Sequence, residues 1–314
     1  MRRVSFLNCH NLYFPGTHKK RGPRSLGSYE LKLKHLARTI RNACNGQLPD
    51  IVGLCEVGDA RVAQELGLQI DPVGKGYQCV WSGIPRAINK AEPQTGLAVL
   101  YKFGTLGRST RKEKTDVAKL GSRHNWMACE FQIGVKASDL VWIVVNHWTS
   151  DYRRASGHAE MRRTTSAREI GEYFTSLNVP SAESAILIGD FNCEPFSKPF
   201  SGNPRTDRLY GVRERALVLR SNNQLMYAYN AMWRRLGEPD DHEDSIVPGY
   251  TATRARGTFA RDKKRQYDWR TLDHVLVTKR VLLGGPIRLN EASLTVEPPY
   301  KGSSDHHALS VDFD

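Results

Sequence analysis

Polar side chains that could hold a metal ion and a phosphate follow an apolar run near the middle of the chain. In residues 185–195, AILIGDFNCEP, a run long enough for a buried strand ends in Asp190 and Asn192. Side chains alternate along a strand, so these two residues point the same way. A polar turn closed by Pro195 explains this segment equally well, because Asp and Asn are common turn residues. The other strand ends must decide between a turn and a site.

Apolar runs elsewhere in the chain carry a polar residue at one end in the same way. Some runs lead into that residue and others follow it. When neighbouring strands alternate in direction, both kinds of end meet at one edge of a sheet. We therefore expect one site that collects side chains from remote parts of the chain. Besides the two residues above, its expected members are Asn8, Glu56, His147, Asp273, Asp305 and His306.

The residue types in this set favour phosphodiester hydrolysis assisted by a divalent metal ion. Carboxylate and amide oxygens are hard ligands, which select Mg²⁺, Mn²⁺ or Ca²⁺ over zinc. The imidazoles of His147 and His306 have pKa values that a protein can adjust around neutrality. A carboxylate beside His306, for which Asp273 is the candidate, would orient the ring and stabilise its charged form. A cation that polarises a phosphoryl oxygen and a group that deprotonates water are the minimum for this reaction.

Short apolar or β-branched runs recur along the chain and have the length and composition of strands. Apolar stripes at helical spacing predict helices over residues 29–44 and 158–177, and a third over 214–236 that Asn222 and Asn223 interrupt. This mixture indicates an α/β fold of mixed sheets covered by helices, and we predict two such sheets packed face to face in a single domain, residues 1–314. The strands are expected at residues 3–7, 50–55, 77–81, 96–101, 126–133, 140–146, 185–189, 274–278 and 308–313.

The charge of the sequence favours a polyanionic partner. A formal net charge of +13 attracts nucleic acid first and an anionic membrane surface second. No apolar run approaches the ~20 residues that cross a bilayer, and the apolar start of the chain is too short for a signal peptide. The six cysteines lack paired metal spacing, which favours reduced thiols in a cytoplasmic protein.

Basic residues are spread widely, and residues 237–273 mix them with aromatic side chains. Cations beside exposed aromatics suit phosphates and unstacked bases, although a solvated surface also explains a charge run. The candidate nucleic-acid contacts are Arg153, Arg154, Lys263, Lys264, Arg265 and Trp269. A broader basic field adds Arg2, Arg3, Lys19, Lys20, Arg21, Arg24, Arg162 and Arg163.

Six motifs in this order resemble those of the endonuclease/exonuclease/phosphatase superfamily, the DNase I-like proteins. They run from Asn8 to His306 and read FLNCHNL, LCE, VNHWTSD, IGDFN, LDHVLV and SSDHHAL. The resemblance implies a four-layered α/β sandwich with one cleft at the sheet edge. NAMWRRLGE and TLDHVLVT add a likeness to bacterial members.

The resemblance also implies how the metal and the attacking water are held. Glu56 would bind Mg²⁺, with Mn²⁺ as the alternative ion and Asp305 in or near the coordination shell. Asp190 and Asn192 would align or activate the water and contact the scissile phosphate. Asn8 would position Asp190 or the metal.

The histidines receive different roles from the same resemblance. His306, oriented by Asp273, would be a general base or a charge stabiliser, and His147 would hydrogen-bond the phosphate in the transition state. His10 stands where many such enzymes have an acidic residue, which would weaken or change a second metal position. His274 replaces a frequent Tyr, and we interpret it as a packing residue.

Three functions fit this pattern. The first is a Mg²⁺-dependent nuclease, an endonuclease acting on DNA, and the broad basic field favours it. The second is a phosphatase or phosphodiesterase acting on a lipid head group or a nucleotide. The third is a catalytically inactive nucleic-acid-binding module of the same fold, which the retention of all six motifs disfavours.

Overall fold

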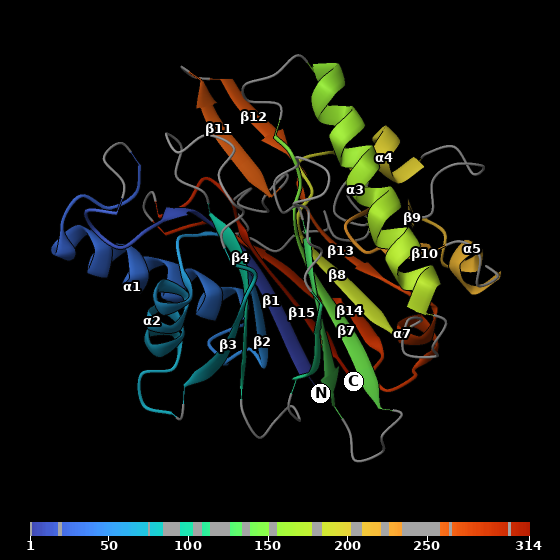
Figure 1. The fold of residues 1–314 in the computed structure, drawn as a ribbon, viewed down its shortest axis with the longest axis horizontal. Helices are drawn as coiled ribbons and strands as arrows, with labels where there is room; N and C mark the ends of the chain where they lie inside the picture. The colour runs from blue at the N-terminus through green and yellow to red at the C-terminus, as the bar shows by residue number, and fades with distance from the viewer. Residues whose placement is uncertain are drawn as a thin grey trace, which may run out of the picture.

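Strands that are apolar on both faces need cover on both sides, and the computed structural model buries them between helices and a second sheet (Figure 1). The structure describes residues 2–17, 21–74, 76–83, 95–102, 109–113, 126–133, 139–150, 156–177, 184–201, 209–220, 226–233, 258–263, 266–300 and 303–314.

The first sheet has six strands in the order β14-β15-β1-β2-β4-β3. Helices α1 (Leu26–Ala43) and α2 (Ala60–Ile70) cover its outer face. A reciprocal pair of hydrogen bonds between Ser25 and Ser28 caps the start of α1, and the side chain of Asp59 caps α2. The strands are β1 (Arg2–Leu12), β2 (Ile51–Val57), β3 (Tyr77–Trp81), β4 (Gly96–Lys102), β14 (Leu289–Glu297) and β15 (Ala308–Phe313).

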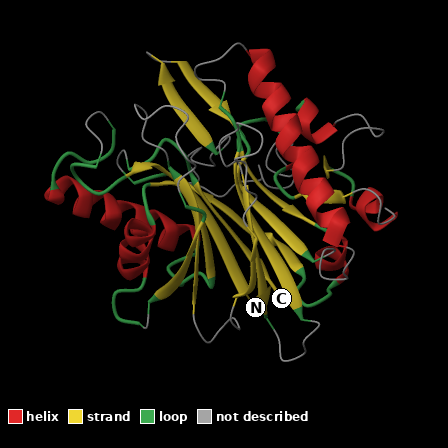
Figure 2. Ribbon diagram, in the orientation of Figure 1, coloured by secondary structure: helices red, strands yellow, loops and turns green. Residues whose placement is uncertain are grey.

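The second sheet has seven strands in the order β5-β6-β7-β8-β13-β10-β9. Its outer face packs against helices, so that helical layers lie on both sides of the paired sheets (Figure 2). Its strands are β5 (Ser109–Glu113), β6 (Trp126–Gln132), β7 (Leu140–His147), β8 (Ala185–Asp190), β9 (Leu209–Val212), β10 (Met226–Asn230) and β13 (Asp273–Val277). The helices on this face are α3 (Ser156–Leu177) and α4 (Lys198–Ser201), whereas α5 (Arg215–Arg220) and α7 (Lys279–Leu283) contribute Val218, Val281 and Leu282 to the core between the sheets. The hairpin β11 (Phe259–Lys263) and β12 (Gln266–Arg270) leads into β13 and projects beyond the sheets.

The alternation of side chains along β8 decides where its polar end points. Ile186 and Ile188 pack in the core between the sheets, whereas Leu187 packs in the core beneath the helices. Asp190 continues the first set and therefore faces the space between the sheets. By the same alternation, Asp273 lies on the inner face of β13 together with Val275 and Val277. The carboxylates of Asp190 and Asp273 therefore lie at the end of the core between the two sheets.

The predicted strands are all present, and one predicted helix is wrong. Within the described part of 214–236, α5 is helical as expected, but Met226–Asn230 forms the strand β10 between β9 and β13. The residues MYAYN alternate tyrosine with other residues, and this period of two suits a strand in a sheet. The sequence analysis also missed several elements, of which α2 is a full amphipathic helix: α2, α4, α7, β5, β9, β11, β12 and β14.

Two arginines of the predicted basic field are structural instead. Arg3 donates through Nη2 to Asp312 at 2.7 Å and through Nη1 to the Cys44 carbonyl at 2.7 Å. Arg163 is buried and donates to the carbonyl of Thr149 at 3.0 Å. These cations join the chain ends and hold the loop after β7, because a buried charge needs a partner. They are not part of a surface that attracts polyanions.

The sequence analysis expected no membrane-spanning segment and free thiols. Among the described residues, no helix is both long and apolar enough to span a membrane. The six cysteines are all free, and all but Cys79 are buried. The thiols therefore pack as small apolar side chains, as expected.

Candidate active site

Unusual backbone conformations mark one edge of the two sheets. Five described residues other than glycine have positive φ, and four of them lie at this edge: His10, Asn11, Glu56 and Asn192. Such conformations are costly for residues with a side chain, and they persist at functional sites where the surrounding structure fixes them. The backbone at this edge therefore departs from regular strand geometry, as is typical of a functional site.

A bulge turns Glu56 into the site. The register of β2 against β4 shifts between Leu54 and Val57, which both pack beneath the helices, and the inserted Glu56 has φ 57°. Without the shift, strand alternation would place Glu56 on the helix side with Leu54. The backbone N–H of Asn11 donates to its Oε2 at 2.8 Å. Burial disfavours the charge of Glu56, but His147 and then His306 outweigh it and hold its pKa below the ordinary value.

The end of β8 is fixed by a glycine and two turn contacts. A Cβ on Gly189 would lie 2.3 Å from the Asn146 carbonyl oxygen, so only glycine lets β7 approach here. Beyond it, the Asn192 backbone N–H donates to Asp190 Oδ1 at 2.9 Å. The side-chain nitrogen of Asn192 donates to the Trp148 carbonyl at 2.9 Å. The polar-turn interpretation is thus correct for the backbone, and the turn aims Asp190 at the other site residues.

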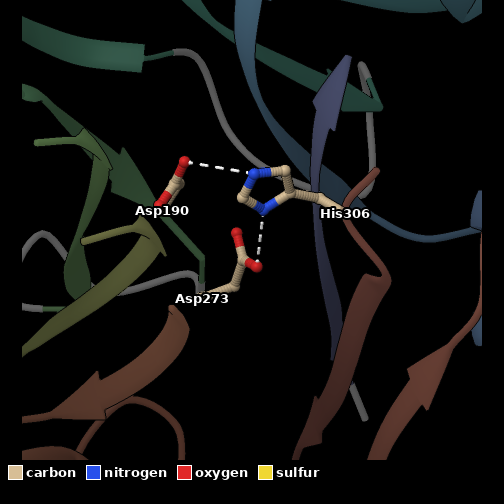
Figure 3. A group of neighbouring side chains, drawn as sticks. All are labelled: Asp190, Asp273 and His306. Carbon is tan, nitrogen blue, oxygen red and sulfur yellow. Dashed lines mark hydrogen bonds and ion pairs between the residues drawn. The ribbon is translucent and has the colours of Figure 1, made fainter. Parts of the chain in front are cut away.

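His306 lies between two carboxylates (Figure 3). Its Nδ1 is 2.8 Å from Asp273 Oδ2, and its Nε2 is 3.6 Å from Asp190 Oδ2. All three side chains are almost fully buried. Burial disfavours the imidazolium, but Asp273 and Asp190 outweigh it and raise the pKa of His306 to about 10. His306 therefore holds a proton at neutral pH.

Asp273 supplies the negative charge that pairs with the His306 imidazolium. Burial raises the pKa of Asp273 to about 6, against the pull of the His306 charge, so it remains ionised above that pH. Thr258 accepts hydrogen bonds from the backbone N–H groups of Leu272 and Asp273 at 3.0 Å and 2.8 Å. The carbonyl of Thr258 also accepts from His307 at 2.7 Å, which joins the two motifs that carry the pair.

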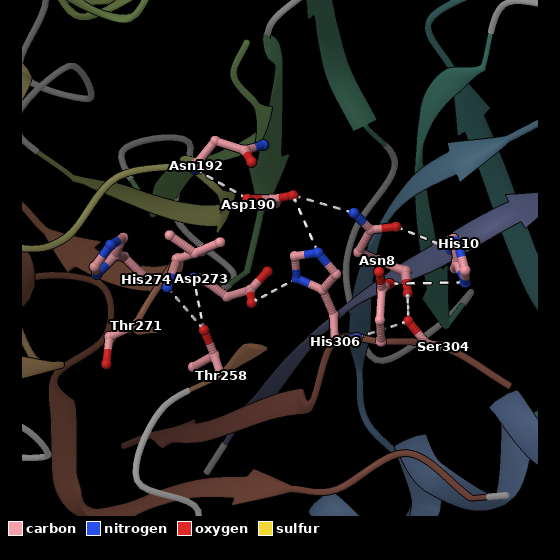
Figure 4. A network of polar contacts seen from close by, with 12 residues as sticks. Asn8, His10, Asp190, Asn192, Thr258, Thr271, Asp273, His274, Ser304 and His306 are labelled. Carbon is pink, nitrogen blue, oxygen red and sulfur yellow. Dashed lines mark hydrogen bonds and ion pairs between the residues drawn. The ribbon is translucent and has the colours of Figure 1, made fainter. Parts of the chain in front are cut away.

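Asn8 connects both halves of the site (Figure 4). Its Nδ2 lies 3.1 Å from Asp190 Oδ2 and 3.4 Å from Glu56 Oε1. The Ser304 hydroxyl donates to the Asn8 carbonyl at 2.7 Å and accepts from the His306 backbone N–H at 3.0 Å. One amide thus fixes the spacing of two carboxylates, and one hydroxyl ties β1 to the His306 segment.

His147 and Asp305 lie at the more open side of the site. His147 Nε2 is 3.6 Å from Glu56 Oε1 and 3.9 Å from Asp190 Oδ2, with a quarter of its side chain exposed. Asp305 is more exposed, and its described contact is with His10 Nδ1 at 3.7 Å. The structure thus brings six predicted residues into one connected cluster, with Asn192 at its base and Asp305 at its margin.

The donor set fits a hard divalent cation. The carboxylates of Glu56 and Asp190, bridged by the Asn8 amide, offer oxygen ligands of the kind that Mg²⁺ and Mn²⁺ prefer. Asp190, Asp273 and His306 also place ligand atoms within 4.8 Å of one another. An ion held by His306 would have to displace a proton that two carboxylates stabilise. The Glu56–Asp190 side is therefore the better candidate.

Sequence reasoning missed three residues that build the site. Ser304 and Gly189 lie inside motifs already noted, so proximity to SSDHH and IGDFN could have identified them. Thr258 comes from the segment before β11, where no pattern marks it. Its role follows only from contacts with the backbone of Asp273 and His307.

The predicted nucleic-acid contacts remain largely undescribed. Arg153, Arg154, Lys264 and Arg265 lie outside the described residues. Lys263 and Trp269 belong to the β11–β12 hairpin, which is described for its backbone pairing alone.

Comparisons with known proteins agree with this geometry. Residues 7–306 match the model of the Endonuclease/Exonuclease/phosphatase family. TDP2 from Caenorhabditis elegans is 16% identical, with 99% of this chain and 74% of that chain covered and a TM-score of 0.56. ANGEL2, described as a 2′,3′-cyclic phosphatase and solved with adenosine-2′,3′-vanadate, is 15% identical, with 99% and 95% covered and a TM-score of 0.54. The human Nocturnin catalytic domain with bound sulfate is 16% identical, with 100% and 94% covered and a TM-score of 0.53. A comparison with curated proteins gave no significant match.

Proposed function

Because the chain belongs to the endonuclease/exonuclease/phosphatase family, we propose that it is a Mg²⁺-dependent endonuclease acting on DNA. Members of this family hydrolyse phosphoester bonds. The two mixed sheets and their flanking helices form the DNase I-like sandwich that the sequence predicted. The observation that carries the proposal is the position of His306 between Asp190 and Asp273, beside the Glu56 carboxylate that accepts from the Asn8 amide. That arrangement supplies a hydrogen-bond donor and an acceptor for a phosphate and a water.

The metal would be held by Glu56 and Asp190, with Asn8 positioning both and Asp305 near the coordination shell. When bound, Mg²⁺ or Mn²⁺ supplies a positive charge that polarises a phosphoryl oxygen. Glu56 is already ionised for this role, because its pKa is lowered by the neighbouring imidazoles despite burial.

Asp190 is the group proposed to orient the attacking water and take its proton. Its Oδ1 accepts from the Asn192 backbone, and its Oδ2 accepts from Asn8, so the carboxylate cannot rotate freely. A fixed acceptor lowers the cost of aligning water with a phosphate. Asn192 keeps one side-chain N–H for the phosphate, since its other contact is with Trp148.

His306 then acts as a charge stabiliser and not as the general base. A group whose pKa is raised to about 10 has no free lone pair to accept a proton at neutral pH. Its Nε2–H is instead available to a developing negative charge. His147, at the open side, donates to a phosphate oxygen in the same way.

DNA is the proposed substrate because the formal net charge is +13, even with Arg3 and Arg163 committed to the interior. We further propose that residues 1–314 are one catalytic domain. A reducing compartment, the cytoplasm, is proposed because the free cysteines form no disulfide.

Cleavage assays test the proposal. Purified protein is incubated with supercoiled plasmid, linear duplex, single-stranded DNA and RNA, with Mg²⁺, with Mn²⁺ and with EDTA. We expect nicking of plasmid that EDTA abolishes. Asp190→Ala and His306→Ala should each lose most activity while circular dichroism stays unchanged, and the exposed His158→Ala serves as the matched control. Binding of DNA without cleavage under any divalent ion would instead indicate an inactive binding module.

A second candidate function is hydrolysis of a small nucleotide phosphoester. The observation that favours it is the similarity to ANGEL2, described as a 2′,3′-cyclic phosphatase. Cyclic nucleotides and a phospholipid head group are therefore assayed beside the polymers. Turnover of a small ester with intact polymer would replace the nuclease proposal by this one.

A further inference from the structure

Two aromatic side chains, one exposed and one partly buried, lie together after the end of β8. Phe196 is 62% exposed, and its ring centroid lies 6.4 Å from that of the partly buried Trp233. Phe196 follows Asn192 by four residues, just after the IGDFN motif. The proposed chemistry uses neither ring. A large exposed aromatic side chain next to a reaction centre suggests a contact with a ligand.

His274 fixes the two segments that carry these rings. Its Nε2 lies 2.7 Å from the Cys193 carbonyl, which can only accept, so Nε2 carries the proton. Its Nδ1 then accepts from Asn230 Nδ2 at 3.3 Å. Phe196 lies three residues beyond Cys193, and Trp233 lies three residues beyond Asn230. The packing role expected for His274 is therefore a bridge that holds both aromatic segments.

The same bridge lies next to the reacting groups. His274 directly follows Asp273, and Figure 4 shows the two side by side at the end of β13. The antiparallel pairing of β10 continues past its end, because the Ala231 N–H donates to the Val275 carbonyl at 2.9 Å. Past this bond the chain turns away from the ladder, because the Met232 N–H donates to the Asn230 side-chain oxygen at 3.0 Å.

We propose that Phe196 and Trp233 form a stacking surface for an unpaired base of the nucleic acid next to the scissile phosphate. The inference rests on the proposed nuclease function and specifies its substrate. Base faces and aromatic rings stack without regard to sequence, and the net charge of +13 favours a polyanion as the occupant over an apolar partner. A duplex keeps its bases stacked on each other. The enzyme therefore prefers single strands, frayed ends or mismatched positions.

Binding without cleavage tests the surface. A single-stranded oligonucleotide containing 2-aminopurine is titrated with protein in EDTA, and anisotropy and 2-aminopurine quenching are measured. We expect Phe196→Ala to weaken binding by about 5- to 100-fold and to remove the quenching. Phe196→Tyr keeps both, whereas Phe196→Leu keeps the bulk but loses the quenching. Leu283→Ala, at an exposed apolar side chain of α7, is the matched control.

An oligonucleotide with one abasic position at a time separates stacking from other causes. The effect of Phe196→Ala should vanish when the stacked base itself is missing. An equal loss on every abasic oligonucleotide would overturn the inference, as would wild-type binding by Phe196→Ala. Loss of binding to anionic phospholipid vesicles in place of DNA would assign the rings to a membrane. Failure of the wild type to cleave any nucleic acid refutes the nuclease proposal separately.

Discussion

Asp190 and Asp273 lie directly opposite each other on the antiparallel strands β8 and β13. Two buried carboxylates at adjacent positions repel each other unless a cation lies between them. His306 takes that position, with Nδ1 toward Asp273 and Nε2 toward Asp190. The cluster therefore stores one proton on the imidazole between the two carboxylates. In the proposed reaction, Asp190 accepts the proton of the water and His306 stabilises the developing charge.

Asp273→Asn should move the pH dependence of the reaction to lower pH. In the wild type, the pKa of His306 is raised to about 10, so activity that needs the imidazolium persists through neutral pH and falls near pH 10. Without the Asp273 charge the pKa of His306 decreases, and the fall begins closer to neutrality. We expect about 10²- to 10⁴-fold lower kcat/KM at pH 8.

The pH profile of kcat/KM checks this expectation, together with an NMR titration of His306. Asp314→Asn, at the exposed C-terminal residue, is the control. A variant profile parallel to that of the wild type would show that Asp273 acts on folding and not on the proton of His306.

The sequence predicted the strands and the members of the site because both depend on local patterns. Asp190 and Asp273 follow or precede runs such as AILIG and VLV, whose apolar character marks a strand at any position in the sheet. The helix over 214–236 failed because an apolar stripe at helical spacing was accepted across Asn222 and Asn223. The alternation in MYAYN was the stronger signal.

The orientation of the site residues could not be predicted in the same way. Glu56 reaches the site through a bulge set by the pairing of β2 with β4, which is a property of two distant segments. Arg3 reads as a surface cation until Asp312 is placed beside it by the pairing of β1 with β15. His274 read as packing because its bridge depends on β10, which was not recognised.

Glu56→Gln should abolish tight metal binding without unfolding the protein. The change keeps the shape and the contact with the Asn11 N–H but removes the negative charge that a divalent ion needs. Loss even of residues that orient ligands costs about 10- to 100-fold in metal affinity, so we expect more than about 100-fold here. Calorimetric titration with MnCl₂ measures the affinity.

Glu297→Gln is the control for metal binding, because Glu297 contacts Asn42 at the surface and not the site. Unchanged Mn²⁺ affinity in Glu56→Gln would remove Glu56 from the ligand set. Thermal unfolding with and without MnCl₂ gives a second readout, since an ion that binds the folded state raises the Tm.

Acid should destabilise the fold through His274. Burial lowers the pKa of His274 from 6.5 to about 4, so the folded state resists a proton that the unfolded chain accepts. The stability that this difference contributes is complete above pH 6.5 and is lost as the pH falls toward 4. The total loss is about 3 kcal/mol. Urea unfolding at a series of pH values measures it.

His274→Gln isolates this contribution. We expect it to be less stable than the wild type at pH 7, because the bridge to Cys193 and Asn230 is disturbed. Its stability should decrease less steeply between pH 6.5 and 4. His307, whose pKa burial also lowers to about 4, still acts in both proteins. Equal slopes would show that His274 does not take up the proton.

Gly189→Ala should separate the strands that carry His147 and Asp190. A Cβ at this position would lie 2.3 Å from the Asn146 carbonyl oxygen and 2.6 Å from its backbone nitrogen, and φ is 154°. Backbone atoms cannot move aside as a flexible side chain can, so β7 and β8 must part near the His147–Asp190 pairing. We expect a loss of roughly 3 kcal/mol in the free energy of unfolding and most of the activity.

Gly27→Ala is the matched control, because a Cβ there meets nothing within 4 Å and alanine favours the helix α1. Urea unfolding and plasmid nicking are measured for both variants. Wild-type stability and nicking in Gly189→Ala would show that the strand ends adjust, and that the spacing of His147 and Asp190 is not set by this glycine.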